Sequence, residues 1–88
     1  MARRFLRKVI YSPQTANDLF LLRSTKDERQ SIKEQARLLA ANPNLGFPIL
    51  FEDPFIGDDR RLYRYDVGRF KLNYTFDQKQ LEIVSVIQ

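Results

Sequence analysis

The sequence is most regular between residues 61 and 87, RLYRYDVGRFKLNYTFDQKQLEIVSVI. Apolar and polar side chains alternate there through three segments, 61–67, 69–77 and 81–87. Gly68 and the triplet Asp77-Gln78-Lys79 separate the segments. A period of two is typical of β-strands with one buried face, and such breaks are typical of tight turns. The stretch therefore predicts an antiparallel meander.

The alternation divides the side chains of the meander between two faces. The face predicted to be core carries Tyr63, Tyr65, Val67, Phe70, Leu72, Tyr74 and Phe76. The opposite face carries Arg64, Asp66, Arg69, Lys71, Asn73 and Thr75. Arg60 and Arg61 immediately precede these residues in the chain and lead into this face. Because Asp66 is the lone acid among these basic residues, the face is predicted to be positively charged. We expect Asp66 and Arg69 to form a cross-strand pair beside the turn.

The residues before the meander predict a strand and two helices. Residues 4–11 alternate and end in an apolar run, which predicts a strand. Ser12-Pro13 begins a helix near residues 13–23, because serine caps helix N-termini and proline suits the first turn. Thr25 and Glu28 have the spacing of a capping box and begin a second helix, which Asn42-Pro43 ends.

Residues 44–59 link the second helix to the meander and contain two prolines and two glycines. They predict a loop, with a short edge strand at Ile49-Leu50-Phe51. The complete pattern, β-α-α-β-β-β, predicts an α+β fold in which a helical hairpin packs on one face of an antiparallel sheet. A chain of 88 residues suits one domain, 1–88.

The composition excludes several kinds of site. The chain has no Cys and no His, so it lacks thiol nucleophiles, disulfides, the usual zinc ligands and the usual general base near neutral pH. We expect no metal or other cofactor. The formal net charge of +4 favours an anionic partner. No segment has the pattern of a signal peptide or membrane span, so we expect a cytoplasmic protein without a membrane partner.

The basic face of the meander predicts a phosphate-binding surface. Arg and Lys can hold a phosphate and neutralise the charge that develops at a scissile phosphodiester. RNA cleavage without a metal needs little more than such cations and groups that move protons. Charged side chains are also ordinary on the exposed face of an antiparallel sheet, so a solvated surface without a ligand is the alternative.

Several stretches together resemble one protein family in their order and spacing. They are the hairpin LYRYDVGRFKLNY at 62–74, the strand LEIVSV at 81–86, VIYSP at 9–13 with Ala16 and Asp18-Leu19, and Leu38-Leu39 followed by NPNLG at 42–46. The chain thereby resembles the RelE/ParE superfamily of toxins from type II toxin–antitoxin systems. The resemblance implies the β-α-α-β-β-β fold, a toxin function and a cognate antitoxin as partner.

The resemblance also implies candidate site residues. Members act mainly as ribosome-dependent mRNA endonucleases or as inhibitors of DNA gyrase. Arg64 and Lys71 stand where the nucleases keep basic residues, and the residue at the position of Lys71 holds the scissile phosphate. Together with the basic face of the meander, this makes Arg64, Arg69 and Lys71 the candidate catalytic residues and Arg60, Arg61 and Asn73 the candidates for RNA binding.

Four departures from the family pattern bear on function. Lys71 replaces an Arg, which keeps the charge but loses the bidentate fork. Asp66 stands where a basic residue is usual, and Arg69 stands where Asp is usual. The nucleases also carry a further Arg, and often a Tyr or His, beyond the final strand, whereas this sequence ends at Gln88.

These features support one principal hypothesis and two alternatives. The principal hypothesis is a toxin that cleaves mRNA on the ribosome through the basic face. One alternative is a gyrase-inhibiting toxin that needs no catalytic residues. The other is a homologue that binds an antitoxin or RNA without catalysis.

Overall fold

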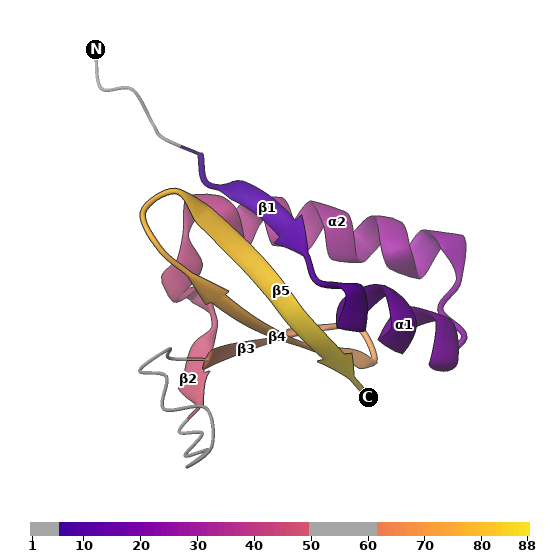
Figure 1. Cartoon of the computed structure of the whole chain (residues 1–88). Helices are drawn as coiled ribbons and strands as arrows, with labels where there is room; N and C mark the ends of the chain where they lie inside the picture. Colours follow the sequence, from indigo (N-terminus) through magenta and orange to yellow (C-terminus); the bar gives the residue numbers. More distant parts are fainter. Residues whose placement is uncertain (1–5, 50–61) are drawn as a thin grey trace.

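The computed structural model describes residues 6–49 and 62–88, which form a mixed sheet of five strands and two α-helices (Figure 1). The elements are β1 (Lys8–Tyr11), α1 (Pro13–Leu21), α2 (Lys26–Ala41), the short 3₁₀ helix η1 (Pro43–Leu45), β2 (Phe47–Ile49), β3 (Leu62–Val67), β4 (Phe70–Phe76) and β5 (Gln80–Ile87). The predicted α+β fold with a helical hairpin and a meander is confirmed.

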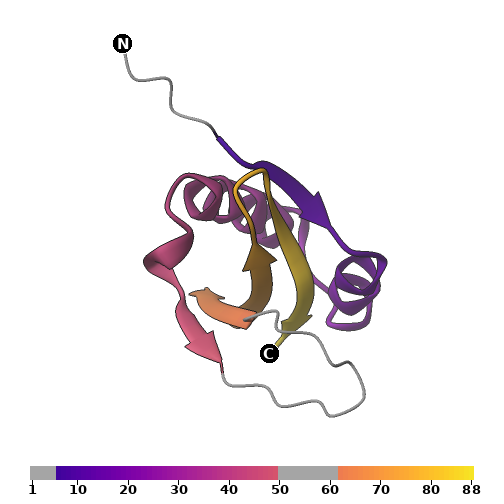
Figure 2. The same ribbon diagram turned by 60° about the vertical axis from the view of Figure 1, so that its left-hand side comes forward.

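The strands are ordered β1-β5-β4-β3-β2, so β1 and β2 form the two edges of the sheet (Figure 2). β1 runs parallel to β5, with Val9 opposite Leu81, and the other neighbouring strands are antiparallel. The sheet is therefore mixed, where a wholly antiparallel one was predicted. The alternation within a strand does not record the direction of its neighbour, because both directions present alternate residues to the same face.

Two strand boundaries differ from the prediction. The first strand begins at Lys8, whereas Arg4 was predicted, and Arg4 lies outside the described residues. The edge strand begins at Phe47, two residues before the predicted Ile49; Leu50 and Phe51 lie outside the described part of the chain. Pro48 has no backbone N–H to donate. It is tolerated in this strand because one side of an edge strand forms no hydrogen bonds with a neighbouring strand.

The helix starts are confirmed by their capping hydrogen bonds. The Ser12 hydroxyl accepts a hydrogen bond from the Thr15 backbone N–H at 3.1 Å and donates one to the carbonyl of Val84 at 2.6 Å, so it also ties α1 to β5. The capping box of α2 is complete, with Glu28 N–H bound to the Thr25 hydroxyl and Thr25 N–H bound to the Glu28 carboxylate. α1 ends at Leu21, two residues before its predicted end.

The hydrophobic core lies between α2 and the inner face of the sheet. Its fully buried members come from α2, β4 and β5: Ile32, Ala36, Leu39, Phe70, Leu72, Tyr74, Leu81, Ile83 and Val86. Tyr63, Tyr65, Val67 and Phe76 pack against them. The predicted core face is thus confirmed, and the other face of β3 and β4 carries the polar residues.

Tyr74 joins the core to the backbone that leads into β2. Its buried hydroxyl donates to the carbonyl of Pro43 at 2.6 Å and accepts from the N–H of Gly46 at 3.0 Å. A Cβ atom on Gly46 would lie 2.3 Å from that hydroxyl and 2.8 Å from the backbone oxygen of Arg64. Glycine therefore allows the close approach that fixes the chain immediately before Phe47.

No helix within the described ranges combines the length and the apolar character needed to cross a membrane.

Candidate nucleic-acid interface

A hydrogen-bonded row of side chains crosses the outer face of the sheet, the face opposite the core. Arg64 on β3 lies opposite Asn73 on β4, which lies opposite Ser85 on β5. The Nε of Arg64 donates to Oδ1 of Asn73 at 3.0 Å, and Nδ2 of Asn73 donates to Oγ of Ser85 at 2.9 Å. All three residues are half-buried. The row therefore holds the Arg64 guanidinium in one orientation.

Lys71 lies on the same outer face, but an acidic residue faces it. Asp66 on β3 is directly opposite Lys71 on β4, and both are exposed. Opposite charges at such positions attract each other across the two strands. Asp66 thus reduces the positive potential around Lys71, whereas the residues opposite Arg64 are the uncharged Asn73 and Phe47.

Arg69 does not join this group. It lies in the turn between β3 and β4, and its guanidinium donates to both carboxylate oxygens of Glu28 at the start of α2, at 2.6 and 3.0 Å. It also donates to the carbonyl of Leu22 at 3.1 Å and lies over the ring of Phe70, 4.3 Å from its centroid.

The prediction that Arg69 shares a face with Arg64 and Lys71 and pairs with Asp66 is therefore wrong. The residue occupies the turn with Gly68, whose φ is +57°, and side chains in a turn do not follow the alternation of the strands. Hydrogen bonding from Arg69 is the main reason why the pKa of Glu28 falls to about 2. The same pairing raises the pKa of Arg69.

The structure thus brings three of the predicted site residues together and places a fourth, Arg69, elsewhere. Arg64, Lys71 and Asn73 share the outer face, and Arg69 lies at the helix side of the turn. Arg60 and Arg61 fall outside the described residues. Across residues 6–49 and 62–88, no group of three or more acidic side chains is placed to hold a metal ion.

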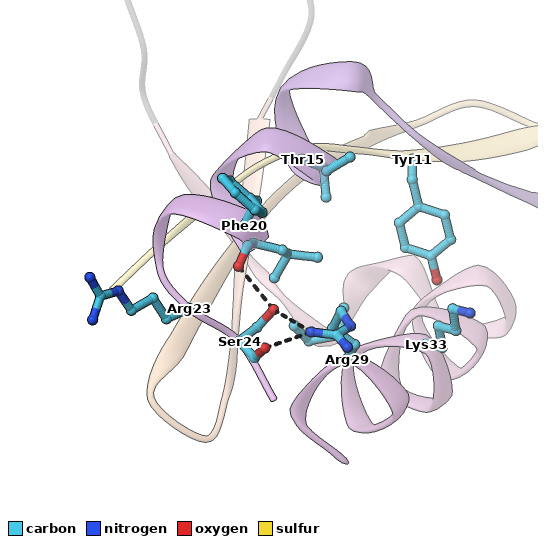
Figure 3. Close-up of a pocket in the computed structure, with 10 residues that line it drawn as sticks. Tyr11, Thr15, Phe20, Arg23, Ser24, Arg29 and Lys33 are labelled. Carbon is cyan, nitrogen blue, oxygen red and sulfur yellow. Dashed lines mark hydrogen bonds between the residues drawn. The ribbon is translucent and has the colours of Figure 1, made fainter. Parts of the chain in front are cut away.

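A second feature, an apolar groove between α1 and α2, lies on the helical side of the molecule (Figure 3). Its volume is about 670 Å³, and its apolar wall includes Ala16, Leu19, Phe20 and Ile32. Phe20 is 80% exposed although it lies at helical spacing with Ala16 and Leu19. Helical spacing of apolar residues indicates one face of a helix that packs, and it does not distinguish a filled interface from an open one.

Basic and polar side chains border the groove. Arg23, Arg29 and Lys33 line it together with Tyr11 from the end of β1 (Figure 3). Burial raises the pKa of the Tyr11 hydroxyl, which is therefore neutral at physiological pH. The connection between the helices is fixed by Ser24, whose hydroxyl donates to the carbonyl of Leu19 at 2.9 Å. An apolar wall with a cationic border suits an amphipathic helix that carries acidic residues.

Comparisons with known proteins identify the fold. No family model matches the sequence, and no curated protein sequence matches it. Among solved structures, a chain of the E. coli DinJ-YafQ toxin–antitoxin complex matches with a TM-score of 0.53 and 19% sequence identity. The match covers 92% of this chain and 90% of that chain. The chain therefore shares its fold with a component of a toxin–antitoxin complex.

Proposed function

We propose that this chain is the toxin of a type II toxin–antitoxin pair and that its outer sheet face binds RNA. The main support for this proposal is the row of hydrogen bonds through which Asn73 and Ser85 hold Arg64. Within the described ranges, Arg64 makes its side-chain hydrogen bond through Nε, and its two Nη atoms donate no hydrogen bond. Such an arrangement leaves the two-pronged end of the guanidinium to meet a phosphate, which it can bind with two parallel hydrogen bonds.

The activity of this face is cleavage of mRNA on the ribosome. Attack of a ribose 2′-hydroxyl on the adjacent phosphate forms a 2′,3′-cyclic phosphate and breaks the bond to the 5′-oxygen, which leaves as a hydroxyl, while the 2′ proton passes to water. Negative charge develops on the phosphoryl oxygens during this step. Arg64 and Lys71 are the described cations of the meander's outer face that can stabilise this charge. Fixed donors stabilise developing charge better than mobile ones, because they need no reorganisation during the reaction. Arg64 is accordingly the principal residue of the site.

A homologue that binds RNA or an antitoxin without cleaving is the second candidate. Two observations favour it: Arg69 is bound to Glu28 on the other side of the turn, and Asp66 faces Lys71. Both reduce the positive charge available at a scissile phosphate. In this case the outer face would still bind RNA through Arg64, and mRNA would remain intact.

The antitoxin binds in the groove between α1 and α2 in this proposal. One amphipathic helix of the antitoxin covers the apolar wall at Phe20, and its acidic residues meet Arg29 and Lys33. The basic border supports this choice, since charges of opposite sign steer association and select partners. The 80% exposure of Phe20 supports it as well, because large exposed apolar side chains mark protein interfaces when they gather around a groove.

The test is mRNA cleavage in a purified translation system. Wild-type protein should produce cuts within the message at codon-phased positions, and Arg64→Ala should abolish them. Lys71→Ala should reduce them, and Lys79→Ala, which removes a cation from the β4–β5 turn, serves as the matched control and should cleave normally. Intact mRNA at excess wild-type protein would contradict cleavage and support the second candidate, provided that the protein still binds RNA.

A further inference from the structure

The row through Arg64 continues onto the edge strand, where it ends in an exposed aromatic ring. Phe47 on β2 is directly opposite Arg64 on β3. Residues directly opposite each other on antiparallel strands share a face, with Cβ atoms about 5 Å apart. Phe47 therefore lies on the outer face beside Arg64, and it is 55% exposed.

The other aromatic residues of this part of the sheet are engaged on the core face. Tyr63 stacks with Tyr74, with ring centroids 5.6 Å apart, and contacts Phe76 at 5.0 Å. Phe47 takes no part in that cluster. Its position is nevertheless fixed, because the N–H of the preceding residue, Gly46, is bound to the hydroxyl of buried Tyr74.

We propose that Phe47 and Arg64 form one nucleotide subsite for single-stranded RNA. A base stacks on the Phe47 ring, and the neighbouring phosphate binds the Nη atoms of Arg64. Aromatic platforms beside cations on an open sheet bind single strands in this way, because every base has a π-face whatever its sequence. This inference rests on the proposed RNA-binding function and adds to it a base contact that sequence analysis did not predict.

Asn73 and Ser85 act in this subsite as positioning residues. Asn73 accepts the hydrogen bond from Nε of Arg64 through Oδ1. Ser85 accepts one from Nδ2 of Asn73 and so fixes which end of the amide faces the guanidinium. Arg64 and Phe47 share the outer face, because they are directly opposite each other on neighbouring strands. A base-and-phosphate pair from one strand can therefore contact both side chains without a change in the backbone.

The test compares two probes by fluorescence anisotropy: a short labelled single-stranded RNA, and a labelled strand of the same length whose residues are abasic. Phe47→Leu should weaken binding of the RNA by about tenfold, which is the typical effect of losing one base stack. Phe47→Tyr, which keeps the ring, should restore it. Neither change should alter binding of the abasic strand, whereas Arg64→Ala should weaken binding of both probes.

Two controls separate stacking from other effects. Leu38→Ala removes a half-exposed apolar side chain from α2 and should leave both affinities unchanged. Thermal unfolding of each variant checks that the fold is retained. A double mutant tests the positioning role of Asn73. The single substitution Asn73→Ala should weaken RNA binding, and adding it to Arg64→Ala should cause no further loss.

Each outcome bears on a different claim. Equal RNA affinity of Phe47→Leu and wild type would overturn the stacking proposal, and so would an equal loss for the base-bearing and abasic strands. An unchanged RNA affinity together with weaker antitoxin binding would assign Phe47 to a protein interface and overturn the subsite. If Arg64→Ala has no effect on either probe, the proposed RNA-binding function itself fails.

Discussion

Arg69 and Glu28 are joined by two hydrogen bonds, at 2.6 and 3.0 Å, which connect the β3–β4 turn to the first turn of α2. Glu28 also completes the capping box with Thr25. One carboxylate therefore begins the second helix and fixes the tip of the hairpin. Because Arg69 makes this contact, Arg64 and Lys71 are the cations that the described residues of the meander place on the outer face.

The Arg69–Glu28 pair predicts a specific dependence of stability on pH. The pKa of Glu28 is about 2 in the folded protein and is ordinarily 4.5. Since the folded-state value is the lower one, the stabilisation is fully present above pH 4.5 and is lost as the pH falls toward 2. Glu28→Gln retains an acceptor for the cap but not the charge. It should lower the free energy of unfolding at pH 7, and the difference from wild type should shrink between pH 4.5 and 2.

Urea unfolding at a series of pH values measures this effect. Arg69→Leu is the companion variant, because it removes the same ion pair from the other side and leaves the capping box intact. Its difference from wild type should decline over the same pH range. A difference that stays constant from neutral to acidic pH would show that the ion pair does not contribute.

Tyr74→Phe tests the contact that fixes the start of β2. The substitution keeps the ring in the core and removes the hydroxyl bound to Pro43 and Gly46. The buried carbonyl and N–H lose their partner, which should lower the free energy of unfolding by about 1–3 kcal/mol. Burial raises the pKa of Tyr74, so the hydroxyl is neutral at pH 7 and its loss removes no charge.

Chemical denaturation at pH 7 measures the cost, and hydrogen exchange locates it. The amide of Gly46 should exchange faster in Tyr74→Phe, whereas amides within α1 should keep their wild-type rates. Stability equal to that of the wild type would argue that water replaces the hydroxyl and that this contact does not fix β2.

Phe20→Ala tests the groove as the antitoxin site. The side chain lies on the groove wall and is 80% exposed, so its removal should have little effect on folding. It should weaken antitoxin binding by roughly 30-fold, the effect expected for a central aromatic contact of about 2 kcal/mol. Titration calorimetry with the product of the neighbouring reading frame measures the affinity. Leu38→Ala, which lies outside the groove, is the control, and equal weakening by both variants would count against this location.

Much of the fold is predictable from local signals in the sequence. The alternation from Tyr63 to Phe76 predicts both the strands and their buried face, and the caps at Ser12 and Thr25 mark the helix starts. The parallel pairing of β1 with β5 was not predictable in this way. It depends on how the helical hairpin packs against the sheet, which no short stretch of residues encodes.

The residues of the candidate site also fall into those that local sequence patterns predict and those that they do not. Arg64, Lys71 and Asn73 lie on strands, so a period of two places them on the correct face. Arg69 lies in a turn, where that period fails, and its partner Glu28 is distant in the sequence. The exposure of Phe20 was not predictable either, because apolar residues at helical spacing indicate burial and not which surfaces remain open, and Phe47 lies in a stretch predicted as loop, which assigned it to no face of the sheet.

The central claim, that this chain acts on mRNA through Arg64, is tested most directly by mapping mRNA 5′ ends in cells after induction. The wild type and Lys79→Ala should arrest growth and produce new, codon-phased ends within coding regions. Arg64→Ala, expressed to the same level, should produce neither effect, and co-expression of the antitoxin should abolish both in the wild type. Growth arrest without new mRNA ends, or identical ends with Arg64→Ala, would contradict the account.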